Sequence, residues 1–445
     1  MKNAILLLLI IATGSFAQQQ QQQKLNLQQS IELGLKNSKD LRISQSKMET
    51  AGAKLSEANS QLLPQLKFQA GYTRLSSVPP FQVQIPFMPN PIKISDVILD
   101  NYNLRVSLQQ PVFTGFRLSS LRSAASLQNQ AAETDYSKDI NEAAFRIQSA
   151  FWQFYKAQQL LSVLNENLIQ NQKHLEDTRN NLQNGLVTQN DVLKLEVLYS
   201  NTKLQQIEAQ NNLDVAKVAF NQALGLPLDA QTDIDVKDIK TDLASEKQGA
   251  YKFEDIIKEA KQNRGELKSL QYRLQASREA AAAARSGWFP SIYLNANYYY
   301  NNPNARYQPP VKQFKDSWDL GVSLSWDIWN WGYTSAQVTQ AEQNAIQSET
   351  SLSQANEAVE LEVYSNYLTY QRSMEKVTVS SQSIDQAKEN YRIINDKYNV
   401  QLATSTDLID AETAVLQAQT NYNNALVDYE LAKARLEKSI GRRIY

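Results

Sequence analysis

Hydrophobic residues recur every seven positions along two long stretches of this chain. The repeat is carried by Leu161, Leu168, Leu175 and Leu182 in the first stretch, and by Val363, Tyr370, Val377, Ile384, Tyr391 and Tyr398 in the second. Sustained seven-residue spacing is typical of helices that supercoil around partners. Neither stretch, at about 117–183 and about 332–399, contains a proline or an internal glycine. Each therefore predicts a helical rod about 100 Å long.

Each rod is followed by a short turn and a second helix that returns along it. The turns cover residues 184–190 and 400–406, and the return helices are expected at about 191–224 and about 407–440. Gly185 suits the left-handed residue that ends many helices, and either Thr188 or Asn190 can cap the helix that follows. The sequence thus predicts two antiparallel helical hairpins.

Segments in which apolar and polar residues alternate precede each rod. They lie at about 65–75 and 101–110, and again at about 291–300 and 317–326. This period predicts strands with one apolar and one wet face, and about ten residues per strand matches a tilted membrane strand. Aromatic residues gather near the strand ends, as in the interfacial girdles of membrane barrels: Tyr72, Tyr102, Phe113, Tyr298, Trp318, Trp326 and Trp329. The alternative, a small sheet packed on an apolar partner, lacks such a partner because the rods are polar.

The same order of segments occurs twice. Short helices, two strands and a helical hairpin occupy residues 27–226 and again 253–445, with a connector at 227–252. Such self-similarity indicates an internal structural repeat. Four strands cannot close a barrel, and an open edge in lipid leaves backbone groups unpaired. Several chains would have to share one barrel, and the residues alone do not decide between two chains and three.

The N-terminus has the features of an export signal. Residues 1–17 combine a basic start at Lys2, an apolar core and the small-x-small ending Ser15-Phe16-Ala17. Residues 18–26, which begin with a glutamine tract, are expected to form a disordered tail. No other segment reaches the roughly 20 apolar residues of a transmembrane helix. The protein is therefore expected to be exported.

Composition argues against most catalytic chemistry. The chain has 45 basic and 46 acidic residues, no cysteine and one histidine. Neutral charge gives no support for nucleic-acid binding, and the lack of cysteine excludes disulfides and thiolate metal sites. His174 lies on a polar helix and is expected to be solvated. Because no phosphate-binding loop, nucleophile motif or metal-ligand cluster is recognisable, no enzyme activity, cofactor or metal is expected.

One pair of acidic residues has two interpretations. Asp407 and Asp410 are three residues apart at the start of a return helix, hence on one helix face. Carboxylates there are stabilised by the helix dipole. If copies of the chain surround a pore, the same pair would instead form an acidic ring that favours cations. The residues leave both interpretations open.

Taken together, these features resemble the TolC family of outer-membrane efflux and secretion channels, over essentially the whole mature chain. The segments that carry the resemblance best are Gly185-Leu186, Asp191-Val192-Leu193 with Glu196, Tyr398, and Asp407-Leu408-Ile409-Asp410-Ala411-Glu412. The resemblance implies a mixed α and β membrane protein. Its fold would be a homotrimeric twelve-stranded β-barrel, continued in the periplasm by a long α-helical coiled-coil barrel.

The resemblance also implies roles for residues at the helical turns. A periplasmic adaptor, coupled to an inner-membrane pump, would dock on the turn residues Gly185, Leu186, Val187, Thr188, Leu402, Ala403 and Thr404. Asp407 and Asp410 match the acidic rings of a closed periplasmic entrance, and Tyr398 and Asp191 fall where a tyrosine–aspartate link holds the inner helices shut. This sequence departs from the family at Ala403, where some members have an arginine, and at Val400-Gln401, which lacks the usual glycine.

The expected function is a passive exit duct in the outer membrane that carries substrates from a pump and its adaptor across the periplasm. Opening would untwist the inner helix pairs, because the adaptor or pump binds the open state better. The alternative from another class is a secreted structural coiled-coil protein without channel activity.

Overall fold

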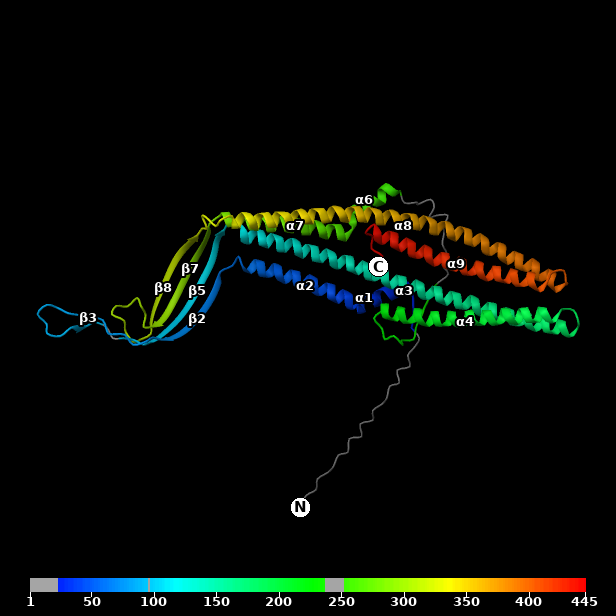
Figure 1. Cartoon of the computed structure of the whole chain (residues 1–445), viewed down its shortest axis with the longest axis horizontal. Helices are drawn as coiled ribbons and strands as arrows, with labels where there is room; N and C mark the ends of the chain where they lie inside the picture. Colours follow the sequence, from blue (N-terminus) through cyan, green and yellow to red (C-terminus); the bar gives the residue numbers. More distant parts are fainter. Residues whose placement is uncertain (1–22, 95–96, 237–251) are drawn as a thin grey trace, which may run out of the picture.

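The computed structural model describes residues 23–94, 97–236 and 252–445 of the chain. A long helical rod carries a β-sheet at one end (Figure 1). Two helices of 67 residues, α3 (Arg117–Gln183) and α8 (Tyr333–Asn399), run the length of the rod. At about 1.5 Å per residue each is about 100 Å long. These are the two rods expected from the uninterrupted seven-residue repeats.

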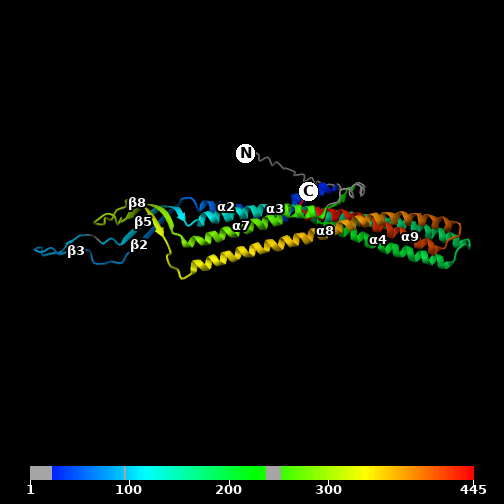
Figure 2. The ribbon, with the colours of Figure 1, turned by 90° about the horizontal axis from the view of Figure 1, so that it is seen from above.

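Each long helix is flanked by two shorter helices, one near the sheet and one near the far end. The four flanking helices are α2 (Lys39–Ser60) and α4 (Gln189–Ala223) beside α3, and α7 (Gly265–Arg285) and α9 (Ser405–Ser439) beside α8. Two small helices, α1 (Leu27–Asn37) and α6 (Phe253–Asn263), lie near the middle of the rod. The α3/α4 and α8/α9 hairpins end beside each other, away from the sheet (Figures 1 and 2). Within the described residues, no helix combines the length and hydrophobicity needed to cross a membrane.

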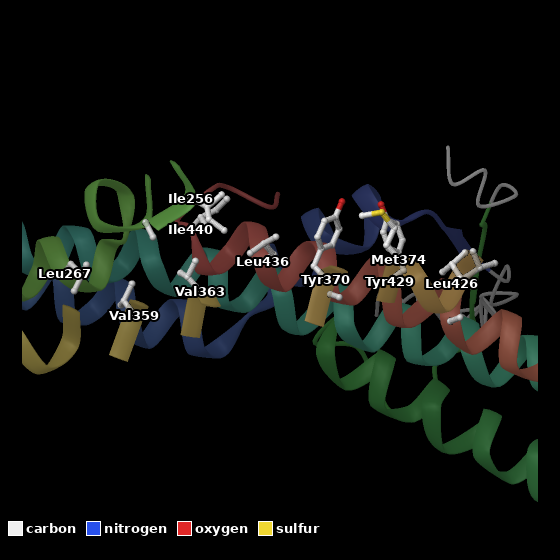
Figure 3. Close-up of a cluster of buried hydrophobic side chains, with 14 residues drawn as sticks. Ile256, Leu267, Val359, Val363, Tyr370, Met374, Leu426, Tyr429, Leu436 and Ile440 are labelled. Atoms are coloured by element: carbon white, nitrogen blue, oxygen red, sulfur yellow. The ribbon is translucent and has the colours of Figure 1, made fainter. Parts of the chain in front are cut away.

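A hydrophobic core fills the middle of the rod where α6, α8 and α9 meet (Figure 3). Val363, Tyr370 and Val377 of the predicted repeat are buried there, and the Tyr370 ring packs 5.7 Å from that of Tyr429. A second core surrounds Phe151 under α1. Its members come from the whole length of the chain: Leu25, Ile234, Phe220, Val427 and Leu431. The repeat therefore packs most fully at mid-rod.

A short strand corrects one expectation about the N-terminus. Residues 23–25, within the segment 18–26 expected to be disordered, form β1 (Gln23–Leu25), which pairs in parallel with β6 (Thr232–Ile234). Leu25 is 3% exposed and Ile234 is 6% exposed. The burial of these two side chains in the second core stabilises the strand pair, although a polar tract precedes it in the sequence. Residues 1–17 and 18–22 lie outside the described residues, as do residues 237–251 of the 227–252 connector.

Four strands form one antiparallel sheet in the order β2-β5-β7-β8. They are β2 (Gln65–Arg74), β5 (Asp100–Thr114), β7 (Ser291–Asn302) and β8 (Lys315–Ser325). Phe68 pairs with Val106, Val106 with Tyr298 and Tyr298 with Trp318, so these apolar side chains share one face. Phe68 and Trp318 remain 68% and 66% exposed. Within the described ranges of the chain, nothing covers this face, and β2 and β8 are open edges of the sheet.

The loops at the end of the sheet away from the helices differ in length. The first contains a small hairpin of β3 (Gln82–Val83) and β4 (Ile92–Lys93), which projects beyond the sheet in Figure 1. Phe87 at its tip is fully exposed and has a positive φ of 82°. The loop between β7 and β8 is shorter.

Both turns at the far end of the rod share one backbone design. Gly185 and Gln401 adopt φ angles of 71° and 62°. The following amides close the turns, from Leu186 to the Asn181 carbonyl at 3.0 Å and from Leu402 to the Lys397 carbonyl at 2.8 Å. This is the Schellman motif, in which glycine is preferred because other residues are strained by about 1 kcal/mol or more. Gln401 therefore carries strain that Gly185 avoids.

The two turns allow a matched exchange. Gln401→Gly should stabilise the α8/α9 turn and Gly185→Gln should destabilise the α3/α4 turn, each by about 0.5–1 kcal/mol. A Cβ atom at Gly185 would meet nothing within 4 Å, so the backbone conformation alone accounts for the second change. Amide hydrogen exchange at the two turns measures both. Equal or lower protection in Gln401→Gly would show that the left-handed glutamine is not strained.

Candidate functional site

The end of the rod opposite the sheet gathers most of the residues singled out from the sequence. We call the turns 184–190 and 400–406, with the adjoining ends of α3, α4, α8 and α9, the helical tip. The turn residues expected to meet an adaptor lie there, and two of them are apolar and exposed, Leu186 at 54% and Leu402 at 77%. Val400 beside them is 63% exposed. Both turns thus present hydrophobic side chains outward.

The first residues of α4 and α9 form the same capping box. The Asp191 carboxylate accepts from the Thr188 amide at 2.9 Å, and the Asp407 carboxylate accepts from the Thr404 amide at 2.8 Å. Each threonine hydroxyl in turn accepts from the aspartate amide, at 3.3 Å and 3.1 Å. Hydrogen bonds from the threonine hydroxyls and amides lower the pKa of both carboxyl groups, so both stay charged. The capping residues therefore place a fixed negative charge at each turn.

The acidic pair on α9 divides into two environments. Asp407 is committed to its own helix N-terminus, as the helix-dipole interpretation expects. Asp410, on the same face, is exposed. In the part of the chain that the structure describes, its carboxylate takes part in no hydrogen bond or ion pair. Asp410 is thus the member of the pair that is available to ions.

The two hairpins are joined at the tip by polar contacts. The Tyr398 hydroxyl of α8 lies 3.1 Å from Thr178 Oγ1 of α3, and the Lys194 ammonium of α4 donates to Thr406 Oγ1 of α9 at 3.0 Å. Tyr398 is therefore bonded to Thr178 rather than to Asp191, the partner expected from the family pattern. The Asp191 carboxylate accepts instead from the amide and the hydroxyl of Thr188 in the capping box. Tyr398 still ties the same two hairpins together.

A polar cluster lies deeper in the rod, formed by Gln170 and His174 of α3, Tyr391 of α8 and Glu412 of α9. Gln170 Nε2 donates to Glu412 Oε1 at 3.0 Å and also contacts the Tyr391 hydroxyl. His174 Nδ1 lies 2.6 Å from the same carboxylate oxygen. The expectation that His174 is solvated was wrong, because its side chain is 13% exposed on the face of α3 that α9 covers. Gln170 and His174 lie one helical turn apart on α3, and this spacing alone does not reveal that α9 covers them.

The aromatic residues expected as a girdle lie toward both ends of the sheet. Tyr72 and Tyr102 pair at the loop end with ring centroids 5.0 Å apart, and Tyr298 opposes Trp318. Phe113 lies near the end of β5, and Trp326 and Trp329 follow β8, 52% and 75% exposed. Among the described residues, no group of three or more acidic or histidine side chains could hold a metal ion.

Several known proteins share this architecture. The family model described as "Outer membrane efflux protein" matches residues 30–226 and 256–442, one segment in each half. The chain is 24% identical over 432 residues to the outer membrane protein TolC of Escherichia coli K12, covering 94% of this chain and 83% of that protein. It is 22% identical over 338 residues to the alkaline protease secretion protein AprF of Pseudomonas aeruginosa, covering 76% of this chain and 69% of that protein.

Among solved structures, the outer membrane protein VceC of Vibrio cholerae matches with a TM-score of 0.77. The match covers 94% of this chain and 97% of that one, at 16% identity. The matched segments comprise both halves of the duplication, their strands and both helical hairpins. The chain belongs to the outer membrane efflux protein family.

Proposed function

We propose that this chain is one of three identical subunits of an outer-membrane exit duct, which conducts substrates passively from a periplasmic adaptor and an inner-membrane pump. The observation that carries this proposal is the direct continuation of an amphipathic four-stranded sheet into polar rods about 100 Å long. An exposed apolar face suits lipid, and exposed polar helices suit water. Family membership supports the same function, as either an efflux or a secretion duct.

The open edges of the sheet support assembly around a common axis. β2 and β8 each have one neighbour in the sheet. In lipid their free backbone groups need a partner strand, which a second copy supplies by pairing its β2 with β8. Three copies of four strands make the twelve-stranded barrel of the TolC family. The homotrimer therefore pairs every edge.

A row of apolar side chains on the rod supports the same assembly. These residues of α4 follow a helical spacing and are exposed in the single chain: Leu193 at 50%, Val197 at 59%, Leu204 at 60% and Ile207 at 54%. A second apolar row, on a helix whose other apolar residues such as Val192, Leu195 and Phe220 are already buried, is typical of coiled-coil packing. In a trimer, α4 would pack on a neighbouring subunit, so that the helices form a coiled-coil barrel below the membrane.

The helical tip is the proposed contact with the adaptor. Leu186, Val400 and Leu402 are exposed apolar residues at the one end of the rod that reaches away from the membrane. A water-exposed apolar patch on a turn suits a protein partner. The adaptor in turn brings the inner-membrane pump to the duct. The alternative function considered from the sequence is a structural coiled-coil fibre. Such a fibre does not require a sheet with an exposed apolar face.

The proposal is tested by electron microscopy of the detergent-extracted membrane fraction. We expect three-fold particles with a detergent belt around the sheet and a rod of about 100 Å projecting from it. Single chains or flexible filaments without a belt would contradict the duct and favour the fibre. Conductance in planar bilayers is the second measurement, and full-length protein that forms three-fold particles should give ion-conducting channels.

The proposed acidic ring predicts a change in ion selectivity. Asp410→Asn should lower the preference for cations over anions, because the exposed carboxylate would face the pore entrance in each of the three subunits. The change leaves the capping box of Asp407 intact. Asp177→Asn serves as the matched control, because it removes an exposed carboxylate from the α3/α4 hairpin instead of from α9. The reversal potential under a salt gradient measures both, and equal values in Asp410→Asn and wild type would remove Asp410 from the pore lining.

The contact between Tyr398 and Thr178 predicts a gate link. Tyr398→Phe should raise the resting conductance, because it deletes a hydrogen bond that ties α8 to α3. If this hydrogen bond stabilises the closed state by about 0.5–1.5 kcal/mol, its loss shifts the closed–open equilibrium roughly two- to tenfold toward the open state. Thr178→Val removes the other partner, and the double variant should add little to either single change. Additive effects in the double variant would mean that the two side chains act separately.

A further inference from the structure

The polar cluster holds the one histidine of the chain against a buried carboxylate. The side chain of Glu412 is 2% exposed and that of His174 is 13% exposed. They come from different hairpins, His174 from α3 and Glu412 from α9. Any movement that separates the α8/α9 hairpin from α3 must therefore separate these two groups.

The charge of Glu412 is incompletely compensated by its neutral neighbours. Gln170 Nε2 donates one hydrogen bond, at 3.0 Å, to Oε1. The other carboxylate oxygen, Oε2, is buried and has no hydrogen-bond partner among the described residues. His174 Nδ1 is 2.6 Å from Oε1, although it is not oriented for a linear hydrogen bond. A buried carboxylate in this setting is costly unless a positive charge lies beside it.

His174 is the group that can supply that charge. The other charged side chains near the cluster, on the four helices around it, are exposed or form ion pairs with one another. The ion pairs are Arg179 of α3 with Glu196 of α4, and Glu389 with Arg392 on α8. The remaining ones are exposed: Lys173, Glu176 and Asp177 on α3, Lys388 on α8 and Asp410 on α9. Two tyrosines are also near, Tyr391 within the cluster and Tyr199 of α4 packed beside Leu175. Burial and the charge of Glu412 raise the pKa of Tyr391, so its hydroxyl stays neutral. A protonated imidazole is thus the available counter-ion.

We propose that His174 and Glu412 form a proton-dependent latch between the α3/α4 hairpin and the α8/α9 hairpin of the duct. This inference rests on the proposed gating at the helical tip. Protonated His174 attracts Glu412 and favours the arrangement in which α9 lies against α3. Neutral His174 leaves the buried carboxylate without a counter-ion and favours separation. The latch is therefore strongest at mildly acidic pH and weakens as histidine loses its proton, so resting conductance rises with pH.

The experiment is the resting conductance of the purified full-length channel in planar bilayers between about pH 5.5 and pH 8, where histidine is the side chain that ordinarily titrates. Wild type should show a several-fold increase across this range. His174→Gln keeps a hydrogen-bonding side chain but cannot gain a proton, and Glu412→Gln keeps the shape but removes the charge. Both variants should give a conductance that no longer depends on pH.

Lys173→Gln is the matched control, because it removes one exposed positive charge next to His174 without touching Glu412. It should keep the pH profile of wild type. The latch is overturned if wild type conducts equally at all pH values, or if His174→Gln retains the wild-type slope. Three-fold particles in electron microscopy establish that each variant is assembled. Assembled wild type that conducts at no pH would instead contradict the proposed duct, so the two failures are distinguishable.

Discussion

Unpaired backbone groups at the edges of the sheet constrain the rest of this structure. A strand in lipid has no water to satisfy its amides and carbonyls, and β2 and β8 each expose one row of them. The proposed assembly pairs both edges, and it follows that the rods continuing from the strands must stand around the same axis. The exposed apolar row on α4 and the contacts between the two hairpins are then consequences of where the strands meet. A sheet that closed within one chain would impose no such arrangement on the helices.

The rod changes character along its length. At mid-rod, Val363, Tyr370 and Val377 are buried against α9 in an apolar seam. Toward the tip the same repeat continues with Tyr391 and Tyr398, whose hydroxyls contact Gln170 and Thr178 instead. Apolar packing resists separation over a wide area, whereas a few hydrogen bonds contribute about 1 kcal/mol each and break one at a time. The contact of α8 with its neighbours thus changes from an apolar seam at mid-rod to hydrogen bonds with α3 toward the tip.

The long helices and the strands were predictable because apolar residues recur in the sequence with the period of each element, seven residues in the helices and two in the strands. The absence of glycine and proline in α3 and α8 set their length, and alternation around Phe68 and Trp318 set the apolar face of the sheet. Single contacts were not predictable in this way. His174 lies on the covered face of α3, which a polar helix does not reveal. The contact of Tyr398 with Thr178 joins two helices whose relative placement no local pattern determines. The pairing of β1 with β6 depends on segments far apart in the chain.

The second core has a consequence for the order in which the exported chain folds. Leu25 at the start of the described chain packs in one cluster with Ile234 of the connector and with Val427 and Leu431 of α9. Its other members, among them Ile147, Phe151 and Phe220, belong to the first half of the chain, so the cluster is completed only when α9 packs onto a core that the first half has begun. Contacts of such long sequence separation form late and leave apolar surface exposed in the meantime. The first half of the duplication therefore leaves part of its core uncovered until Val427 and Leu431 of the last helix pack against it.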